Sequence, residues 1–298
     1  MAGTPLPVIV NRSGGTAASL GATLGDVLHA AFAEAGLEID LHLVEGDQMS
    51  ECLDRHSSAP VIAVGGGDGT LGQSAGVLAG TGTALAILPL GTRNHLARQL
   101  GIPLDLIDAA KAIAGGRRSP MDLAKAGERV FINNASAGLY TRLVRAREAA
   151  RGPKWLATIP AALHVLRHLR DRRVTLTIDG QRRVIKTPLL FIGNNRYSLE
   201  PGSVGERDSL TDGVLSLYAL APKSAGQLVA FALRAMFGHA DLHNDFAALA
   251  EAKTVIIEGH GMVRIAFDGE VEHAQLPLRL EIIPAALEVI VPQARPPR

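Results

Sequence analysis

The chain has 298 residues, of which 47% are hydrophobic and 20% charged, and its formal net charge is +1. At this length one hydrophobic core usually stops growing, so we expect two domains. The near-neutral charge and an aromatic content of 4% exclude a general attraction for nucleic acid, and no nucleic-acid partner is predicted. A single cysteine, Cys52, excludes an internal disulfide framework, and no cysteine–histidine cluster has zinc spacing.

Signals for secretion and for membrane insertion are missing from the sequence. The N-terminus lacks a basic segment followed by a long apolar run, and no stretch of about eighteen consecutive apolar residues occurs. Together with the single cysteine, these features predict a cytoplasmic protein in a reducing compartment.

The first third of the chain alternates between strand and helix patterns. Strands are predicted at 7–11, 39–44, 61–64 and 84–88, and helices at 16–35, 47–55, 71–78 and 95–100. This alternation predicts an α/β, doubly wound, Rossmann-like lobe with a parallel sheet. Ligands of such folds bind outside the carboxyl ends of the strands, where Asn11, Asp68 and Thr92 fall.

Two glycine-containing loops follow strands in this lobe, at 65–70 and at 89–94. Glycine lets backbone N–H groups approach a polyphosphate closely, and the start of a helix adds a partial positive charge. The loops therefore predict a phosphate-binding site, with plain tight turns as the alternative. We interpret Asp68 as a group that orients a nucleotide or belongs to a magnesium network. The Walker sequence is absent, so this is not a P-loop of that type.

After residue 118 the pattern becomes rich in strands. They are predicted at 130–133, 174–178, 183–185, 189–192, 214–219, 254–258, 262–267 and 278–283. Asp179 and Gly180 indicate a hairpin turn between two of them, and 224–237 is predicted to be a helix. The second lobe is therefore predicted to be an antiparallel β-sandwich.

Basic residues interleaved with apolar ones are concentrated between 142 and 173. The basic residues are Arg142, Arg145, Arg147, Arg151, Lys154, Arg167, Arg170, Arg172 and Arg173. With Trp155 and several leucines between them, they favour basic amphipathic helices that rest on an anionic membrane surface. The alternative is a solvated helix whose apolar stripe packs on its own domain.

Three motifs resemble the diacylglycerol kinase catalytic domain family of bacterial lipid kinases, which shares its fold with NAD kinases and phosphofructokinases. They are Gly66-Gly67-Asp68-Gly69-Thr70, Leu88-Pro89-Leu90-Gly91-Thr92-Arg93-Asn94 followed by Ala97-Arg98, and Phe267-Asp268-Gly269-Glu270. Weaker similarities lie at 10–15, 131–140 and 191–195. The resemblance implies that a last strand at 286–291 returns to the first lobe. The nucleotide-binding domain would then comprise 1–122 and 285–298, and the β-sandwich domain 123–284.

The resemblance also implies roles for individual residues. Glu270 would be the general base, with Asp268 beside it in the metal and phosphate network. Asp212 would bind Mg²⁺ with the carbonyl groups of Ser209 and Val214. Asp122 is our own interpretation from this sequence: it would compensate for an acidic group that is missing at His95 and help Asp68 to organise Mg²⁺. The implied nucleotide-binding residues are Asn11, Gly66, Gly67, Asp68, Gly69, Thr70, Gly91, Thr92 and Asn94. Without the resemblance, the Asp-Gly pairs at 212 and 268 are ordinary turns.

Two positions depart from the family pattern: His95 stands where many relatives have aspartate, and Gly72-Gln73 replaces the usual Asn-Glu pair. His95 is interpreted as a phosphate ligand or as a hydrogen-bond partner of Asp68.

The leading hypothesis is a lipid kinase that uses ATP and Mg²⁺ to phosphorylate a diacylglycerol-like hydroxyl in the interlobe cleft. It would associate peripherally with the inner face of the membrane, and a homodimer is compatible with it. The alternatives are a kinase of a soluble nucleotide or sugar, and a catalytically inactive nucleotide sensor.

Overall fold

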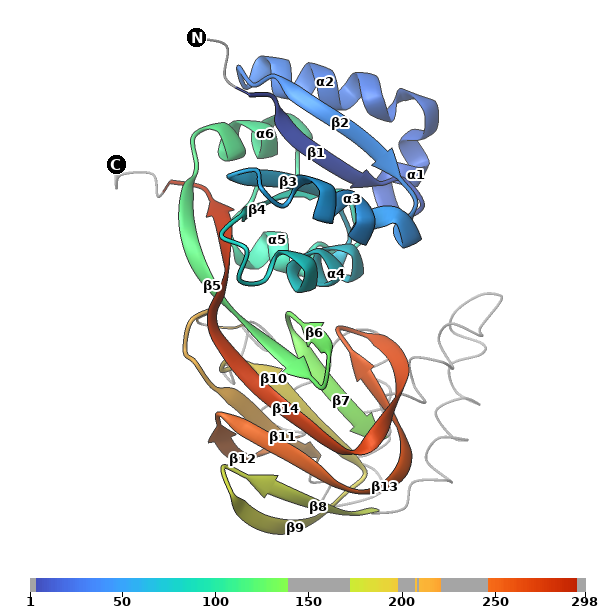
Figure 1. Cartoon of the computed structure of the whole chain (residues 1–298), viewed down its shortest axis with the longest axis vertical. Helices are drawn as coiled ribbons and strands as arrows, with labels where there is room; N and C mark the ends of the chain where they lie inside the picture. The colour runs from blue at the N-terminus through green and yellow to red at the C-terminus, as the bar shows by residue number, and fades with distance from the viewer. Residues whose placement is uncertain (1–3, 139–171, 198–206, 208, 221–245, 294–298) are drawn as a thin grey trace. The chain divides into compact units, whose positions relative to one another are not determined.

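The computed structural model describes residues 4–138, 172–197, 207, 209–220 and 246–293 (Figure 1). The chain divides into two compact units. Unit 1 comprises Met1–Leu123 with Pro284–Arg298, and unit 2 comprises Ala124–Ile283.

Unit 1 is built on a parallel sheet. Its strands lie in the order β2, β1, β3, β4 and β14, and each neighbouring pair is parallel. The bounds are β1 Leu6–Asn11, β2 Ile39–Val44, β3 Val61–Gly66, β4 Ala84–Pro89 and β14 Glu270–Val291. Only the last part of β14 belongs to this sheet, where Glu288 pairs with Ala84. The central strands β3 and β4 are almost wholly buried, as their continuous apolar sequences predict.

Helices cover the sheet of unit 1. They are α1 Gly15–Leu20, α2 Leu24–Glu34, α3 Met49–His56, α4 Asp68–Leu78, α5 His95–Gln99 and α6 Leu106–Ala114, with short 3₁₀ turns η1 Gly21–Thr23 and η2 Gly46–Gln48. Helix α2 packs beside α6, and α3 packs beside α4 (Figure 1). Right-handed crossovers place these two pairs on opposite faces of the sheet. The doubly wound Rossmann-like fold is confirmed.

The helices of unit 1 differ from the predicted ones at three places. The helix predicted at 16–35 is interrupted at Gly21, whose φ of 53° is left-handed and cannot continue an α-helix. Helix α4 begins at Asp68 instead of Leu71, because Gly67 takes an extended conformation and becomes its N-cap. Helix α6 was not predicted, although Asp105 accepts the N–H groups of two residues in its first turn and Gly115 follows its end.

Unit 2 is antiparallel. Its strands are β5 Arg117–Ala126, which begins in unit 1, β6 Arg129–Phe131, β7 Asn134–Gly138, β8 Arg172–Ile178, β9 Gln181–Thr187, β10 Leu189–Asn194, β11 Leu215–Leu220, β12 Phe246–Ala252, β13 Thr254–Phe267 and β14. The main sheet has the order β12, β11, β10, β7, β13, β14; in addition, β8 pairs with β13 and β9. The buried rings of Phe131 and Phe267 lie 5.6 Å apart in the core. The antiparallel β-sandwich is confirmed.

Several local predictions for unit 2 can be compared with the structure. The Asp179-Gly180 turn is confirmed between β8 and β9. The strands predicted at 254–258 and 262–267 form the single strand β13 with an irregularity between them. The strand predicted at 130–133 ends at Phe131, because the chain turns before β7.

Two predicted segments fall where the structure describes nothing. The helix predicted at 224–237 and the basic segment up to 171 lie outside the described residues, while Arg172 and Arg173 at the end of that segment begin β8 and are not helical. Among the helices that are described, none combines the length and apolar character needed to span a membrane.

Candidate active site

Three loops meet at the carboxyl edge of the unit 1 sheet, after β1, β3 and β4. Asn11 ends β1, and its side-chain Nδ2 donates a hydrogen bond of 3.1 Å to Thr70 Oγ1 in the first turn of α4. The Oδ1 atom of Asn11 accepts the N–H of Ser13 at 3.0 Å. Asn11 therefore fixes the first loop to the second.

Glycine is required where these loops touch. A Cβ atom on Gly91 would lie 2.4 Å from the Cα of Gly67, and one on Gly66 would lie 2.6 Å from the Cβ of Thr70. Gly15 has a φ of 59°, and its Cβ would lie 2.4 Å from the carbonyl oxygen of Leu90. The backbones of the three loops are thus in direct contact, which a side chain at these positions would prevent.

Asp68 joins the second loop to the third. Its Oδ2 atom accepts the N–H of His95 at 3.2 Å, and its Oδ1 atom accepts the N–H of Leu96 at 3.1 Å. The carboxylate therefore caps the start of α5 while lying in the first turn of α4, a favourable place for negative charge. The expected contact between His95 and Asp68 exists, but it uses the backbone of His95, and its side chain is exposed.

Asn94 holds the third loop in shape. It is left-handed with a φ of 51°, its Oδ1 accepts the N–H of Gly91 at 2.8 Å, and its Nδ2 donates to the Pro89 carbonyl at 3.2 Å. The side chain is buried, so Asn94 supports the loop from within. Thr92 is exposed on the same loop, and Gly69 lies with Thr70 in the first turn of α4.

In unit 2, Asp268 and Gly269 form the two-residue turn between β13 and β14. Both have positive φ, 50° and 94°, and Phe267 pairs with Glu270 across the turn. The Asp268 carboxylate accepts three backbone N–H groups, from Ile132 at 2.8 Å, Asn133 at 2.7 Å and Asn134 at 3.1 Å. This is why the strand predicted at 130–133 stops at Phe131: its next N–H groups bind Asp268.

Burial acts on the charge of Asp268. Removal from water raises the pKa of this carboxyl group above its ordinary value, while the three backbone N–H groups and the Arg207 guanidinium oppose the rise. Asp268 is thus built into the packing of unit 2.

Glu270 follows this turn and is open to solvent. Its side chain is 59% exposed, and Oε2 lies 3.1 Å from Nη2 of Arg129. The same guanidinium reaches Oε1 of Glu272 through Nε at 3.0 Å. Arg129 therefore holds two carboxylates on β14, of which Glu270 is the more exposed.

The predicted metal ligands Ser209, Asp212 and Val214 lie in one loop before β11. Asp212 is largely buried, accepts the backbone N–H of Arg196 at 3.2 Å and lies 3.8 Å from the Arg196 guanidinium. The Val214 carbonyl accepts the N–H of Asn195 at 2.9 Å, and Ser209 Oγ accepts the N–H of Thr211 at 3.0 Å. A carboxylate and two carbonyl oxygens are hard ligands that fit Mg²⁺ by type.

Asp122 lies in β5 and is only 2% exposed. Its Oδ1 accepts the N–H of Ala285 at 2.7 Å, and Ala285 has a positive φ of 49°. The Asp122 carboxylate is therefore better placed to support an unusual backbone conformation in β14 than to bind a metal in an open position.

Two family models match the chain. The diacylglycerol kinase catalytic domain matches residues 5–126, and the YegS C-terminal NAD kinase beta sandwich-like domain matches residues 133–291. A Pseudomonas putida protein that is described as "probable lipid kinase YegS-like" is 33% identical over 240 residues, which cover 79% of this chain and 78% of that protein. The chain belongs to the diacylglycerol kinase family.

Two further similar proteins are described as a diacylglycerol kinase and a putative diacylglycerol kinase. A diacylglycerol kinase of Mycobacterium tuberculosis is 28% identical over 256 residues, covering 80% of this chain and 81% of that one. The crystal structure of a putative diacylglycerol kinase from Bacillus anthracis has 25% sequence identity and a TM-score of 0.70, covering 98% of this chain and 96% of that chain.

One departure of this chain from the diacylglycerol kinase pattern, Gly72-Gln73, has a local explanation. Gln73 donates from Nε2 to Ser50 Oγ at 3.0 Å and so joins α4 to α3. Gly72 is buried on the same helix. These residues serve the packing of unit 1.

Sequence reasoning missed the buried polar network around Asp268. Arg207 is 7% exposed and donates to the carbonyl oxygens of Ile132 and Asn194 and, at 2.9 Å, to Asn133 Oδ1. Asn194 also donates to the Ile132 carbonyl at 2.9 Å, and Tyr197 donates to that of Asn133 at 3.0 Å. The only sequence signal was a pair of Asn-Asn dipeptides at 133 and 194 beside apolar strands.

Proposed function

We propose that this member of the diacylglycerol kinase family is an Mg²⁺-dependent lipid kinase that transfers the γ-phosphoryl group of ATP to the hydroxyl group of a diacylglycerol-like lipid. The observation that carries the proposal is the joining of three loops by Asn11 and Asp68 at the carboxyl edge of a parallel sheet. That edge is where such folds bind nucleotides. Family membership supports the lipid as acceptor.

The nucleotide phosphates are proposed to lie on the glycine-bearing loops. Gly66, Gly67, Gly69 and Gly91 would offer backbone N–H groups, and Thr70 and Thr92 would offer hydroxyl groups. In this proposal Asp68, Asn11 and Asn94 act mainly by fixing the loops, because their side chains already bind the backbone or hydroxyl groups of these loops.

Glu270 is proposed to accept the proton of the lipid hydroxyl. As that O–H bond breaks, the oxygen attacks the γ-phosphorus, and the bond from phosphorus to the β–γ bridging oxygen breaks, which releases ADP. Arg129 orients the Glu270 carboxylate. Mg²⁺, when bound by the phosphates, offsets their charge, and a second Mg²⁺ is proposed at Asp212 with the carbonyl groups of Ser209 and Val214.

The protein is proposed to reach its substrate by peripheral binding to an anionic membrane. The sequence of the basic segment between 142 and 173 supports this binding. At about 1 kcal/mol for each basic residue near the surface, three or four contacts give weak, reversible binding. Replacing Arg167, Arg170 and Arg172 by glutamine should reduce binding to anionic vesicles and leave binding to ATP unchanged.

The deciding experiment is a transfer assay with matched variants. The purified protein is incubated with radiolabelled ATP, Mg²⁺ and anionic vesicles that contain diacylglycerol or a bacterial lipid extract, and the organic phase is chromatographed. Glu270→Gln should lower transfer by about 10²- to 10⁴-fold, the range for loss of a general base. Glu272→Gln is the control, because Glu272 also pairs with Arg129 and lies two residues along the same strand.

Each alternative gives its own result in this assay. Label in a soluble nucleotide or sugar without lipid would indicate a kinase of soluble acceptors. ATP binding with no transfer, unchanged by Glu270→Gln, would indicate a nucleotide sensor. Equal losses in Glu270→Gln and Glu272→Gln would remove the role of Glu270 as base.

A further inference from the structure

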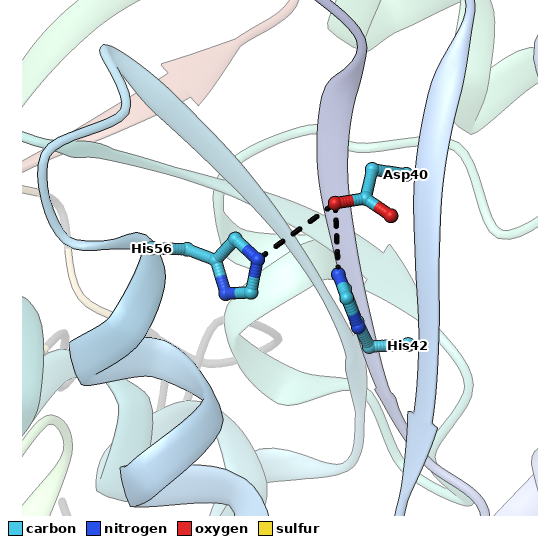
Figure 2. A group of neighbouring side chains, drawn as sticks. All are labelled: Asp40, His42 and His56. Atoms are coloured by element: carbon cyan, nitrogen blue, oxygen red, sulfur yellow. Dashed lines mark ion pairs between the residues drawn. The ribbon is translucent and has the colours of Figure 1, made fainter.

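Three side chains that commonly bind metals gather on unit 1, away from the glycine-bearing loops. Asp40 and His42 are two residues apart on β2, and His56 is the last residue of α3 (Figure 2). Asp40 pairs with Pro7 near the start of β1, so the group lies toward the amino end of the parallel sheet. The proposed nucleotide edge is at the carboxyl end.

The three ligand atoms are close enough to share one ion. Oδ2 of Asp40 lies 3.0 Å from Nε2 of His42 and 3.8 Å from Nε2 of His56. One ligand atom from each of the three residues lies within 4.8 Å of those of the other two. In a tetrahedral zinc site with bonds of about 2.1 Å, ligand atoms are roughly 3.4 Å apart. Small side-chain rotations would bring the group to that geometry.

A backbone hydrogen bond sets the tautomer of His56. Its Nδ1 lies 2.8 Å from the carbonyl oxygen of Cys52, which can only accept. The neutral ring therefore carries its hydrogen on Nδ1, and Nε2 directs a lone pair toward the Asp40 carboxylate. Two lone pairs facing each other repel unless a proton or a cation lies between them. Metal-bound histidines are commonly oriented in this way, by a hydrogen bond from the other ring nitrogen.

The surroundings suit an ion that enters from solvent. The side chain of His42 is 27% exposed and that of His56 is 20% exposed, while Asp40 is exposed. The imidazole rings are tilted by 50° with centroids 4.5 Å apart, so they converge without stacking flat. Two imidazole nitrogens and one carboxylate oxygen favour zinc and similar transition metals over Mg²⁺.

We propose that Asp40, His42 and His56 form a binding site for Zn²⁺ or a similar divalent transition metal, with water completing the coordination. Such an ion would join β2 to the end of α3 and stabilise unit 1. The proposal stands independently of the kinase function, because these residues do not take part in the glycine-bearing loops. The sequence did not reveal the group, since its ligands are separated by an entire helix.

The first test measures zinc binding directly. Tag-free full-length protein is dialysed against Zn²⁺ in buffer that contains Mg²⁺, and bound metal is determined by elemental analysis. We expect one Zn²⁺ for each chain, with an affinity at least tenfold weaker in His42→Gln and in His56→Gln. His29→Gln is the matched control, because His29 is an exposed histidine of unit 1 on α2. Equal Zn²⁺ binding by the wild type and by a variant that combines His42→Gln with His56→Gln would overturn the proposal.

A second measurement uses the unaltered chain, so it does not depend on the folding of a variant. In protein with ¹⁵N-labelled histidine, Zn²⁺ should shift the Nε2 resonances of two rings, and Co²⁺ should give the strong visible absorption of a four-coordinate site. If Zn²⁺ shifts neither ring, the close approach of these side chains is a proton-mediated ion pair and the metal site does not exist. ATP binding should be the same with and without Zn²⁺.

Discussion

The two Asp-Gly turns of unit 2 share one design. Asp179-Gly180 joins β8 to β9, Asp268-Gly269 joins β13 to β14, and all four residues have positive φ. Each aspartate donates its own N–H to a backbone carbonyl of a neighbouring segment and accepts N–H groups of that segment with its carboxylate. The shared design shows that an aspartate in such a turn has a structural task.

The surroundings of the two turns differ. Asp179 is exposed and accepts the N–H groups of Lys253 and Thr254, whereas Asp268 accepts three N–H groups beside the buried Arg207. The next residue is Gln181 after one turn and Glu270 after the other. The comparison therefore assigns the structural task to Asp268 and leaves the proposed chemistry to Glu270.

Replacing each aspartate by alanine should give the largest contrast. A buried N–H group left without an acceptor costs about 1–3 kcal/mol, so Asp268→Ala should lower the free energy of unfolding by about 3 kcal/mol or more. Asp179→Ala should cost about 1 kcal/mol, because water can reach the N–H groups of Lys253 and Thr254. Urea unfolding measures both, and hydrogen exchange should accelerate at 132–134 in Asp268→Ala alone. Equal losses would contradict the comparison.

The buried arginine beside Asp268 gives the next largest effect. Arg207→Met leaves the carbonyl groups of Ile132 and Asn194 with fewer donors, and we expect a loss of about 2–4 kcal/mol in the free energy of unfolding. Arg196→Met removes an exposed pair with Glu251 and the 3.8 Å approach to Asp212, and should lower the free energy of unfolding by less than about 1 kcal/mol. A similar loss in both variants would show that burial is not what distinguishes these arginines.

The sequence predicted both turns but not their difference. Asp-Gly between strand patterns indicates a hairpin, because both residues accept positive φ. What separates the turns is the contact of Asp268 with 132–134 and with Arg207, groups that lie far away in the chain. Local patterns do not contain such contacts.

The difference between local patterns and contacts of distant groups also explains which other features could be predicted. The strand positions in unit 1 followed from short apolar runs, and the glycine-bearing loops followed from the glycines that come directly after two of these strands. The capping of α5 by Asp68 and the meeting of Asp40 with His56 depend on packing between elements, so the structure was needed to find them.

Glu270, the residue after the second turn, is the subject of a smaller expected effect, which should be seen in activity. Arg129→Gln removes the group that orients Glu270, and we expect kcat to fall about tenfold, which corresponds to about 1.4 kcal/mol of transition-state stabilisation. Arg183→Gln, an exposed arginine on β9 near the other turn, should have no effect. If the separate variant Arg129→Lys keeps most of the rate, the role of Arg129 is positional. A fall in ATP binding would instead place Arg129 at the nucleotide.

The smallest effect is in the dependence of stability on pH. Because burial raises the pKa of Asp268 in the folded state, the folded protein binds this proton more tightly than the unfolded chain does. The part of the stability that comes from protonation of this carboxyl group is therefore fully present below its unfolded pKa of about 3.9, and is lost as pH rises through the higher folded pKa.

Asp268→Asn cannot titrate, so the stability of the wild type relative to this variant should decrease as pH rises through that interval. Glu251 and Glu281 have lowered pKa values and the opposite dependence, but they are present in both proteins and cancel in the difference. Urea unfolding of both proteins at a series of pH values measures the effect. A difference that grows with pH would show that the N–H groups of 132–134 outweigh burial, and that Asp268 is held in place chiefly as an anion.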